Sequence, residues 1–457
     1  ALGAQPFVQV QWGLYLFSPS LDGLRALADL PDPQPQVPEA GGVGLPAPTE
    51  PLSVWKLRLE TGSAADRHAV WQQVRAAGGV VDAGDYGVLV GSRDAAMTVL
   101  RDPGDRFSVR GYGQRMEAGI GLGYLGQDGE AHDLLATTLN ETLRRIPAVT
   151  GYGLAHKVAT GFLSALPRDP DCGLFAVDLV ALCDFVIAKA CRHWFGLPDG
   201  KAMLEFPAFD PARARCPASQ VQIARHVFLP HPQGPVEPLG IHAGKQVHAA
   251  GAAHVDELRN GQVEPAPIAK AVLDAVDAAL PGQPQAECDR VATSTLVGLL
   301  QGLPATVFGH LSKVLMAWLD DGRLWERQRE LATVPDRQNA NAVMEWLMPH
   351  LQAQMALDPV PDLIWRTSGV DATLGKLKIA QGRKVVVSLR SVAADTSDPA
   401  ARHAALFGSA PVGSPATFHG CPGDAMAHGL MLGVLVALFE AGSMQRSGSP
   451  TALWLRR

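Results

Sequence analysis

The stretch Phe418 to Glu440, FHGCPGDAMAHGLMLGVLVALFE, restricts the possible folds more than any other part of this 457-residue chain. Its second half is apolar on nearly every side, which predicts a helix inside a large core rather than on a surface. Pro422 suits the first turn of a helix, and Asp424 lies where a negative charge favours the helix dipole. The pattern therefore places Cys421 immediately before a buried helix.

A cysteine in this position has particular chemistry available. The helix dipole and unpaired backbone amides stabilise its thiolate, and a thiolate in a buried pocket is a good axial ligand for haem iron. Gly420 and Gly423 have no side chains, so the backbone can pass close to a flat macrocycle. On the loop alone, a buried structural cysteine is an equal alternative.

Composition narrows the class of protein. Hydrophobic residues make up 47% of the chain and charged residues 18%, enough apolar material for a large core. The net charge of −6 argues against nucleic acid as a partner, because phosphate binding needs a basic surface. The six cysteines are scattered without a CxxC pair, so neither a zinc site nor a disulfide framework is indicated. Reduced thiols fit a cytoplasmic protein best.

Two apolar segments raise the question of a membrane. Residues 7–17 are shorter than the about 20 apolar residues that span a bilayer, and no basic stretch precedes them as in a signal peptide. Residues 293–319 are longer, but Gln301, Pro304 and His310 interrupt them. We expect a kinked core helix there and no stable membrane span.

The chain reads as an N-terminal arm or linker, 1–52, followed by one domain, 53–457. Residues 30–51 are rich in Pro and Gly, and 228–244 are expected to form a loop. Gly121-x-Gly123-x-x-Gly126 spells a dinucleotide fingerprint, but no strand precedes it and no helix follows directly, so a flexible loop is expected. The predicted helices are 64–77, 173–196, 288–320 and 323–333; the predicted strands are 80–81, 87–90, 374–379 and 385–389.

The cysteine loop also carries a resemblance to a known family. His419-x-Cys421-x-Gly423-x-x-x-Ala427 resembles the second half of the haem loop of cytochromes P-450. Residues 357–366 and 374–399 are similar to the segments that follow that family's K helix, and DGEAH at 128–132 is similar to the start of its C helix. The resemblance implies a mainly α, cytochrome P-450-like fold, with a long central helix and small β-sheets around a buried haem b. It places the haem between the helix 288–320 and the loop 417–423.

The resemblance also implies roles for individual residues. Cys421 would be the iron ligand, and Arg366, His419 and His132 would hold the haem propionates by charge-assisted hydrogen bonds. Gly423 and Gly302 would lie against the cofactor. The distal pocket would contain Gly302, Leu303, Pro304 and Thr306, with catalytic roles expected at Cys421, Thr306 and Pro304.

Several positions depart from the family's pattern. The acid and arginine of its ExxR motif fall on Gln352 and Met355, and its Phe and Gly ahead of the cysteine fall on Ser414 and Thr417. The C-helix arginine falls on Ala136. A buried ion pair can be replaced by well-packed groups without loss of stability, so these changes do not exclude the fold.

The departure that matters for chemistry lies in the long helix. The segment aligns with the family so that Gly302 keeps its place, Pro304 and Ala305 occupy the positions of the acid and the alcohol that deliver protons, and Thr306 comes one place late. Neither Pro nor Ala can donate a proton from its side chain. The usual relay is therefore missing, unless Thr306, Gln301 or His310 substitutes together with water.

These features predict a haem-thiolate oxidoreductase acting on an apolar organic substrate, such as a lipid or secondary metabolite, with a peroxide or hydroperoxide as oxidant. One alternative is a monooxygenase that uses dioxygen and electrons from a separate ferredoxin or reductase, because no flavin or NAD(P)H module is recognisable. Three further alternatives are an isomerase or lyase that acts on a hydroperoxide without external electrons, a non-catalytic haem protein that acts as a sensor or carrier, and a helical scaffold with a structural cysteine.

Overall fold

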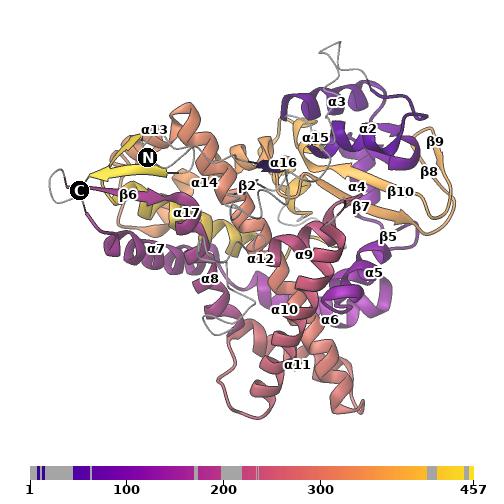
Figure 1. The fold of residues 1–457 in the computed structure, drawn as a ribbon, viewed down its shortest axis with the longest axis horizontal. Coiled ribbons are helices and arrows are strands. Elements are labelled where there is room, and N and C mark those ends of the chain that lie inside the picture. Colours follow the sequence, from indigo (N-terminus) through magenta and orange to yellow (C-terminus); the bar gives the residue numbers. More distant parts are fainter. Residues whose placement is uncertain are drawn as a thin grey trace, which may run out of the picture.

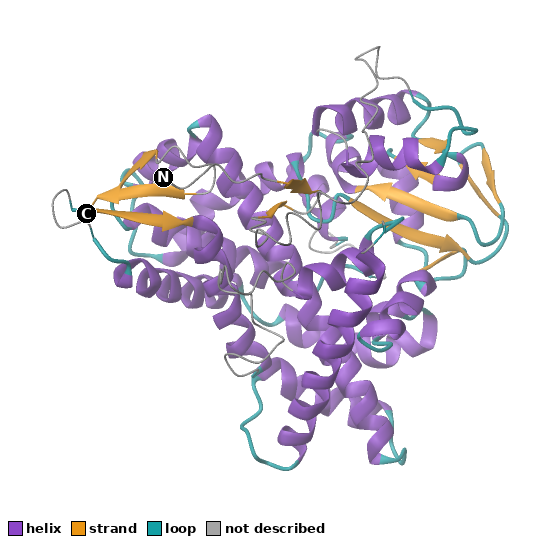
Figure 2. Cartoon of the chain, in the orientation of Figure 1, coloured by secondary structure: helices purple, strands orange, loops and turns teal. Residues whose placement is uncertain are grey.

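The computed structural model describes residues 8–10, 13–15, 45–61, 64–168, 173–196, 219–232, 234, 236–408, 419–446 and 452–456. The expected arm, 1–52, lies largely outside these ranges, as do Ser414 and Thr417. The described part is predominantly helical with small sheets at two sides (Figures 1 and 2). The mainly α fold class predicted from the sequence is thus confirmed.

One long helix, α12 (Gln285–Asp321), runs through the middle of the molecule (Figure 1). Within the described ranges it is the one helix long and apolar enough to cross a membrane, and 83% of its most apolar window is buried inside the protein. That burial explains why the helix is apolar on most sides. Pro304 lies inside it, so the Leu300 carbonyl loses its usual helical donor.

The remaining helices surround α12. Three of them matter most for the site: α6 begins just after Asp128, α14 precedes the main sheet, and α17 follows Cys421. In sequence order the helices are α2 (Leu52–Lys56), η1 (Leu57–Thr61), α3 (Ala64–Ala76), η2 (Gly84–Tyr86), α4 (Arg93–Leu100), α5 (Arg110–Gly119), η3 (Tyr124–Gly126), α6 (Gly129–Arg144), α7 (Ala148–Ala165), α8 (Leu179–Phe195), α9 (Ser219–Phe228), α10 (Val236–Arg259), α11 (Pro267–Ala279), α12, α13 (Arg323–Leu331), α14 (Ala340–Leu357), α15 (Leu389–Ala394), α16 (Pro399–Phe407) and α17 (Asp424–Glu440).

The largest described sheet has five strands in the order β3-β4-β10-β7-β5. β10 runs parallel to β4, and the other neighbours are antiparallel. A three-stranded sheet, β11-β12-β6, lies at the opposite side of the molecule (Figure 1). The strands are β1 (Val8–Val10), β2 (Gly13–Tyr15), β3 (Val80–Asp82), β4 (Val88–Val90), β5 (Phe107–Ser108), β6 (Leu174–Asp178), β7 (Leu363–Ser368), β8 (Ala372–Leu374), β9 (Leu377–Ile379), β10 (Lys384–Ser388), β11 (Ser443–Arg446) and β12 (Ala452–Arg456).

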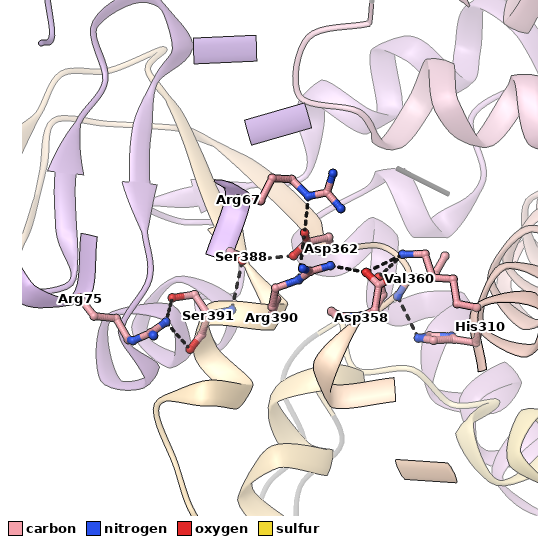
Figure 3. Close-up of polar contacts among 11 residues, drawn as sticks. Arg67, Arg75, His310, Asp358, Val360, Asp362, Ser388, Arg390 and Ser391 are labelled. Atoms are coloured by element: carbon pink, nitrogen blue, oxygen red, sulfur yellow. Dashed lines mark hydrogen bonds and ion pairs between the residues drawn. The ribbon is translucent and has the colours of Figure 1, made fainter. Parts of the chain in front are cut away.

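A buried ionic network joins the five-stranded sheet and its helices to α12 (Figure 3). Lys313 of α12 donates to Asp358 at 2.9 Å, and Arg390 of α15 also pairs with Asp358. Asp362 lies 3.5 Å from Arg390 and 3.8 Å from Arg67 of α3. We call these five residues the junction network. Its members come from segments far apart in the chain. The network therefore connects two parts of the fold, the five-stranded sheet with its helices and the part around α12.

Two local predictions need correction. Residues 173–196 do not form a single helix, because β6 occupies Leu174–Asp178 before α8 begins. Residues 228–244 are not all loop, because α10 begins at Val236. Pro238 is compatible with that start, since the N–H groups of a helix's first turn need no helical partner. Gly244 fits because a Cβ there would lie 3.0 Å from Gly119 of α5, so the two helices pack closely.

Candidate functional site

Cys421 lies where the sequence predicted it, on the loop leading into α17. Its N–H donates to the Phe407 carbonyl at 2.7 Å, which ties the loop to the end of α16. Burial raises the pKa of the thiol to about 11, although the Gly423 N–H opposes this shift by bonding to the sulfur. Cys421 is nevertheless exposed. The thiol is surrounded by protein atoms but can be reached by solvent from one side. A thiol in such a place needs a cation beside it to be mainly deprotonated at neutral pH.

Two predicted binding residues, His132 and Arg366, lie close to a third, His419, which contacts the Asp128 carboxylate. His419 Nε2 lies 3.4 Å from Asp128 Oδ1, and the rings of His419 and His132 pack edge to face with centroids 4.5 Å apart. Burial lowers the pKa of His419, and the hydrogen bond to Asp128 opposes this shift. The charge of Arg366, on β7, lowers the same pKa further. We call Asp128, His132, Arg366 and His419 the cradle.

Asp128 organises the cradle, and sequence reasoning gave it no role. It precedes α6, and its carboxylate accepts hydrogen bonds from the Ser108 hydroxyl at 2.5 Å and the Val109 N–H at 3.1 Å. Burial alone would raise its pKa, but the hydrogen bonds from His419, Ser108 and Val109 lower it below the usual range. The only signal in the sequence was its place at the head of DGEAH.

The surroundings of Arg366 show that the cradle could hold a bound anion. Its side chain is buried, and burial lowers its pKa, with Tyr112 and Asp128 opposing the shift. Its guanidinium donates to the Trp365 carbonyl at 2.9 Å and stacks 5.7 Å from the Tyr112 ring. Among the described residues no carboxylate lies within ion-pair distance of it. A buried charge needs a counter-charge, and the carboxylates of a haem would supply one.

The middle of α12 presents an open face. Gly302 is exposed although its helix is otherwise buried there, and a Cβ added to it would meet no atom within 4 Å. Thr306 lies one turn later on the same face, and its hydroxyl donates to the Gly302 carbonyl. Leu303 and Pro304 are buried. The face available to a ligand is therefore that of Gly302 and Thr306.

Helix geometry bears on the alignment of this segment. Successive residues turn by about 100°, so Pro304 points roughly 200° away from both Gly302 and Thr306. Thr306, rather than Ala305, follows Gly302 at the one-turn spacing that places a hydroxyl on the Gly302 carbonyl. Thr306 therefore supplies an alcohol on the Gly302 face, and neither Pro304 nor Ala305 carries an acid.

The other candidate proton donors of α12 are accounted for differently. His310 is buried, its Nε2 accepts the Val360 N–H at 2.8 Å, and its other ring nitrogen bonds to the Thr306 carbonyl. Burial lowers its pKa to about 3. Burial therefore keeps His310 neutral, and the Val360 N–H occupies its Nε2 (Figure 3). Gln301 is also buried, and neither atom of its amide has a hydrogen-bond partner within the described structure.

The remaining predicted positions have simpler surroundings. Gly423 precedes α17, and a Cβ there would meet only Met426 Cε at 3.6 Å, so its protein neighbours do not require a glycine. Ala136 is buried on α6, and Met355 is buried on α14. Gln352 contacts His403, a residue that sequence reasoning did not single out.

Comparison with known proteins identifies the fold. No protein-family model and no curated protein matches the sequence. Among solved structures, epothilone D-bound cytochrome P450epoK matches with a TM-score of 0.62 at 14% identity, over 87% of this chain and 98% of that one. Cytochrome P450SP alpha, in complex with (R)-ibuprophen, gives 0.60 at 17% identity, over 89% and 98%. The tirandamycin C-bound P-450 monooxygenase TamI gives 0.58 at 16% identity, over 84% and 92%.

Proposed function

From the cytochrome P-450 fold of this chain, we propose that it is a cytoplasmic haem-thiolate oxidoreductase acting on an apolar organic substrate. The observation that carries the proposal is the buried Arg366 of the cradle, which has no carboxylate within ion-pair distance in the described structure; Cys421, just before α17, supplies the thiol. A haem b would supply a partner for both residues: its iron would bind the thiolate, and its carboxylates would pair with the guanidinium.

The residues divide into four groups by what they would do. Cys421 would ligate the iron, with the Gly423 N–H bonded to its sulfur. Arg366, His419 and His132 would hold the propionates, and Gly302 and Gly423 would leave room for the ring. When bound, such a haem supplies oxidising chemistry tuned by electron donation from the thiolate. Thr306 would face the reacting side and position a ligand through its hydroxyl, while Pro304 would act only by shaping α12.

We propose a peroxide or hydroperoxide as the oxidant. Dioxygen chemistry needs two electrons and two protons from outside, whereas a peroxide is already reduced by two electrons. One of its oxygens goes to the substrate, and the other leaves as an alcohol from an organic hydroperoxide or as water from hydrogen peroxide. Ala305 carries no acid, and His310 has both ring nitrogens bonded to backbone. The side-chain proton supply along this part of α12 therefore stops at the Thr306 hydroxyl.

One observation favours the dioxygen alternative. The Thr306 hydroxyl lies on the Gly302 face, where an alcohol could pass a proton toward a bound haem. A monooxygenase of this kind would take electrons from a separate ferredoxin or reductase. Turnover with a hydroperoxide and no reductant supports the first proposal; turnover that requires dioxygen, reductant and Thr306 supports the second. Haem binding with neither activity would indicate a sensor or carrier.

Cys421→Ser tests the haem assignment. Purified wild-type protein should hold about one haem per chain and, when reduced and treated with carbon monoxide, show the red-shifted Soret band of a thiolate-ligated haem. Cys421→Ser should abolish that band, because a serine hydroxyl does not replace a thiolate donor. Cys288→Ser, in a buried cysteine of α12 at its N-terminal end, is the matched control and should keep the band. An unchanged band in Cys421→Ser would refute the assignment.

A further inference from the structure

Gln352 stands where the resembled family has the acid of its ExxR pair, and it begins a short chain of polar contacts. Gln352, on α14, places its Nε2 3.3 Å from Nδ1 of His403 on α16. His403 Nε2 in turn lies 3.1 Å from Asp424 Oδ2. Asp424 is the first residue of α17, three residues after Cys421. The chain therefore runs from the helix of the missing ion pair to the cysteine loop.

The three side chains are chemically consistent with one another. The amide nitrogen of Gln352 can only donate, so His403 Nδ1 accepts. The same neutral tautomer then carries its proton on Nε2 and donates it to the Asp424 carboxylate. A second histidine also contacts Asp424: the Nδ1 of His428 donates to the backbone carbonyl of Asp424 at 2.7 Å.

α16 makes a second contact with the same loop. The Phe407 carbonyl accepts the Cys421 N–H at 2.7 Å, and Phe407 lies one helical turn after His403. The rings of His403 and Phe407 are 4.8 Å apart, and both lie against His428 of α17. α16 thus contacts the cysteine loop at two points. Its Phe407 carbonyl accepts the Cys421 N–H, and its His403 side chain contacts Asp424, three residues beyond the cysteine.

We propose that Gln352, His403 and Asp424 form a positioning chain that fixes the Cys421 loop and replaces the missing acid–arginine pair. The inference rests on the proposed function for its haem readouts only. Met355, at the arginine position, is buried and contributes packing. His403 and Asp424 are positioning residues, since their role is to hold the loop rather than to touch the cofactor.

His403→Ala tests the chain in the full-length holoprotein. Loss of an outer partner of a metal ligand typically weakens binding by roughly ten- to a hundredfold. We therefore expect haem to dissociate about tenfold faster or more, and the carbon monoxide complex to shift in part from the thiolate band to the thiol-ligated one. His403→Gln should restore part of both, because an amide can bond to Gln352 and Asp424 together.

α17 offers a matched control at its other end. His156 Nε2 lies 2.7 Å from Glu440 Oε2, and this pair is partly exposed like the pair of His403 and Asp424. His156→Ala should leave the haem dissociation rate and the carbon monoxide bands as in the wild type. Equal behaviour of His156→Ala and His403→Ala would overturn the proposal, because the effect would then be a general loosening of α17.

A double-mutant cycle makes the test independent of haem. Urea unfolding of the protein without haem is compared for His403→Ala, Asp424→Asn and the double variant. If the residues act as one chain, the double variant should be no less stable than the less stable single variant. Strict additivity would overturn the chain even if the wild type binds haem. Non-additivity in a protein that binds no haem would uphold the chain and reject the proposed function.

Discussion

Glu60 is a buried acid whose protonation links the stability of this protein to pH. It lies in η1 with 3% of its surface exposed, and its Oε1 accepts the Tyr86 hydroxyl at 2.9 Å. Burial raises its pKa from 4.5 to about 7, against the opposing effects of Tyr86 and Lys56. Between those two values the unfolded chain has lost a proton that the folded protein still holds. Stability therefore falls as pH rises through this window.

Replacing Glu60 by Gln should remove that fall, because an amide resembles the protonated carboxyl group. A pKa difference of one unit between the folded and unfolded states is worth about 1.4 kcal/mol. Near pH 7.5 the free energy of unfolding of the variant should therefore exceed that of the wild type by about 3 kcal/mol, with little difference near pH 4.5. Urea unfolding at several pH values measures this. Glu141→Gln, at an exposed position, should follow the wild type. Parallel pH profiles for wild type and Glu60→Gln would contradict the prediction.

At the scale of residues, the sequence identified the cradle but not its centre. Arg366, His419 and His132 could be carried over from short motifs, and the structure brings them close together, with His419 in contact with Asp128. The role of Asp128 depends on Ser108 and Val109, which lie about twenty residues earlier. His403 had no motif at all, because its partners come from α14 and α17. Contacts of that kind are set by tertiary packing.

At the scale of the element, α12 combines a broken hydrogen-bond pattern with an open face. Gly302 should be replaceable by Ala in the protein without haem, because a Cβ there meets no atom within 4 Å. Ala is favoured over Gly inside a helix by about 1 kcal/mol. We therefore expect Gly302→Ala to raise the free energy of unfolding by about that amount. In the haem-loaded protein, the new methyl group should weaken the binding of imidazole to the iron.

Gly298→Ala is the control, one turn earlier on α12. A Cβ there would be in ordinary contact with Met116 Cε at 3.5 Å, so a similar gain in stability is expected. Its effect on imidazole binding, followed by the Soret shift, should be small. If the two variants alter imidazole binding equally, the open face of α12 does not adjoin the cofactor.

Element boundaries show where sequence patterns lose their information. The predicted helix 64–77 appears as α3, and 288–320 as α12, because long periodic segments depend mainly on their own residues. The start of α10 was missed because Pro and Gly between 234 and 244 indicate a loop when taken alone. The close approach of Gly244 to Gly119 explains a glycine inside α10, and it involves a helix more than a hundred residues earlier.

At the scale of the whole molecule, the junction network holds the five-stranded sheet and its helices against α12 (Figure 3). Helical sequence patterns and the resemblance of the cysteine loop to cytochromes P-450 were enough to predict the fold class. It could not predict that Arg67 and Arg390 would meet at Asp362, since these residues are separated by some three hundred positions. The relative placement of the two parts of the fold therefore depends on pairs that no local pattern encodes.

Asp362→Asn should show how much that placement is worth. Asp362 is 1% exposed, also accepts the Ser388 hydroxyl at 3.2 Å, and lies between two guanidinium groups. Without its charge Arg67 and Arg390 repel each other; even in the wild type, burial and the charge of Arg390 lower the pKa of Arg67. Removing one partner of a buried ion pair costs about 3–5 kcal/mol, and we expect a loss of that size in urea unfolding.

The control for Asp362→Asn lies in the same part of the fold. Asp371 is exposed and accepts only the Gln381 N–H at 2.8 Å, so Asp371→Asn should change stability by less than about 0.5 kcal/mol. A second outcome distinguishes local damage from loss of the junction. If the network couples the two parts, tryptophan fluorescence and far-ultraviolet circular dichroism should give separate unfolding transitions in Asp362→Asn and a single one in the wild type. Coincident transitions, with stability within about 1 kcal/mol of the wild type, would mean that apolar packing alone joins the two parts.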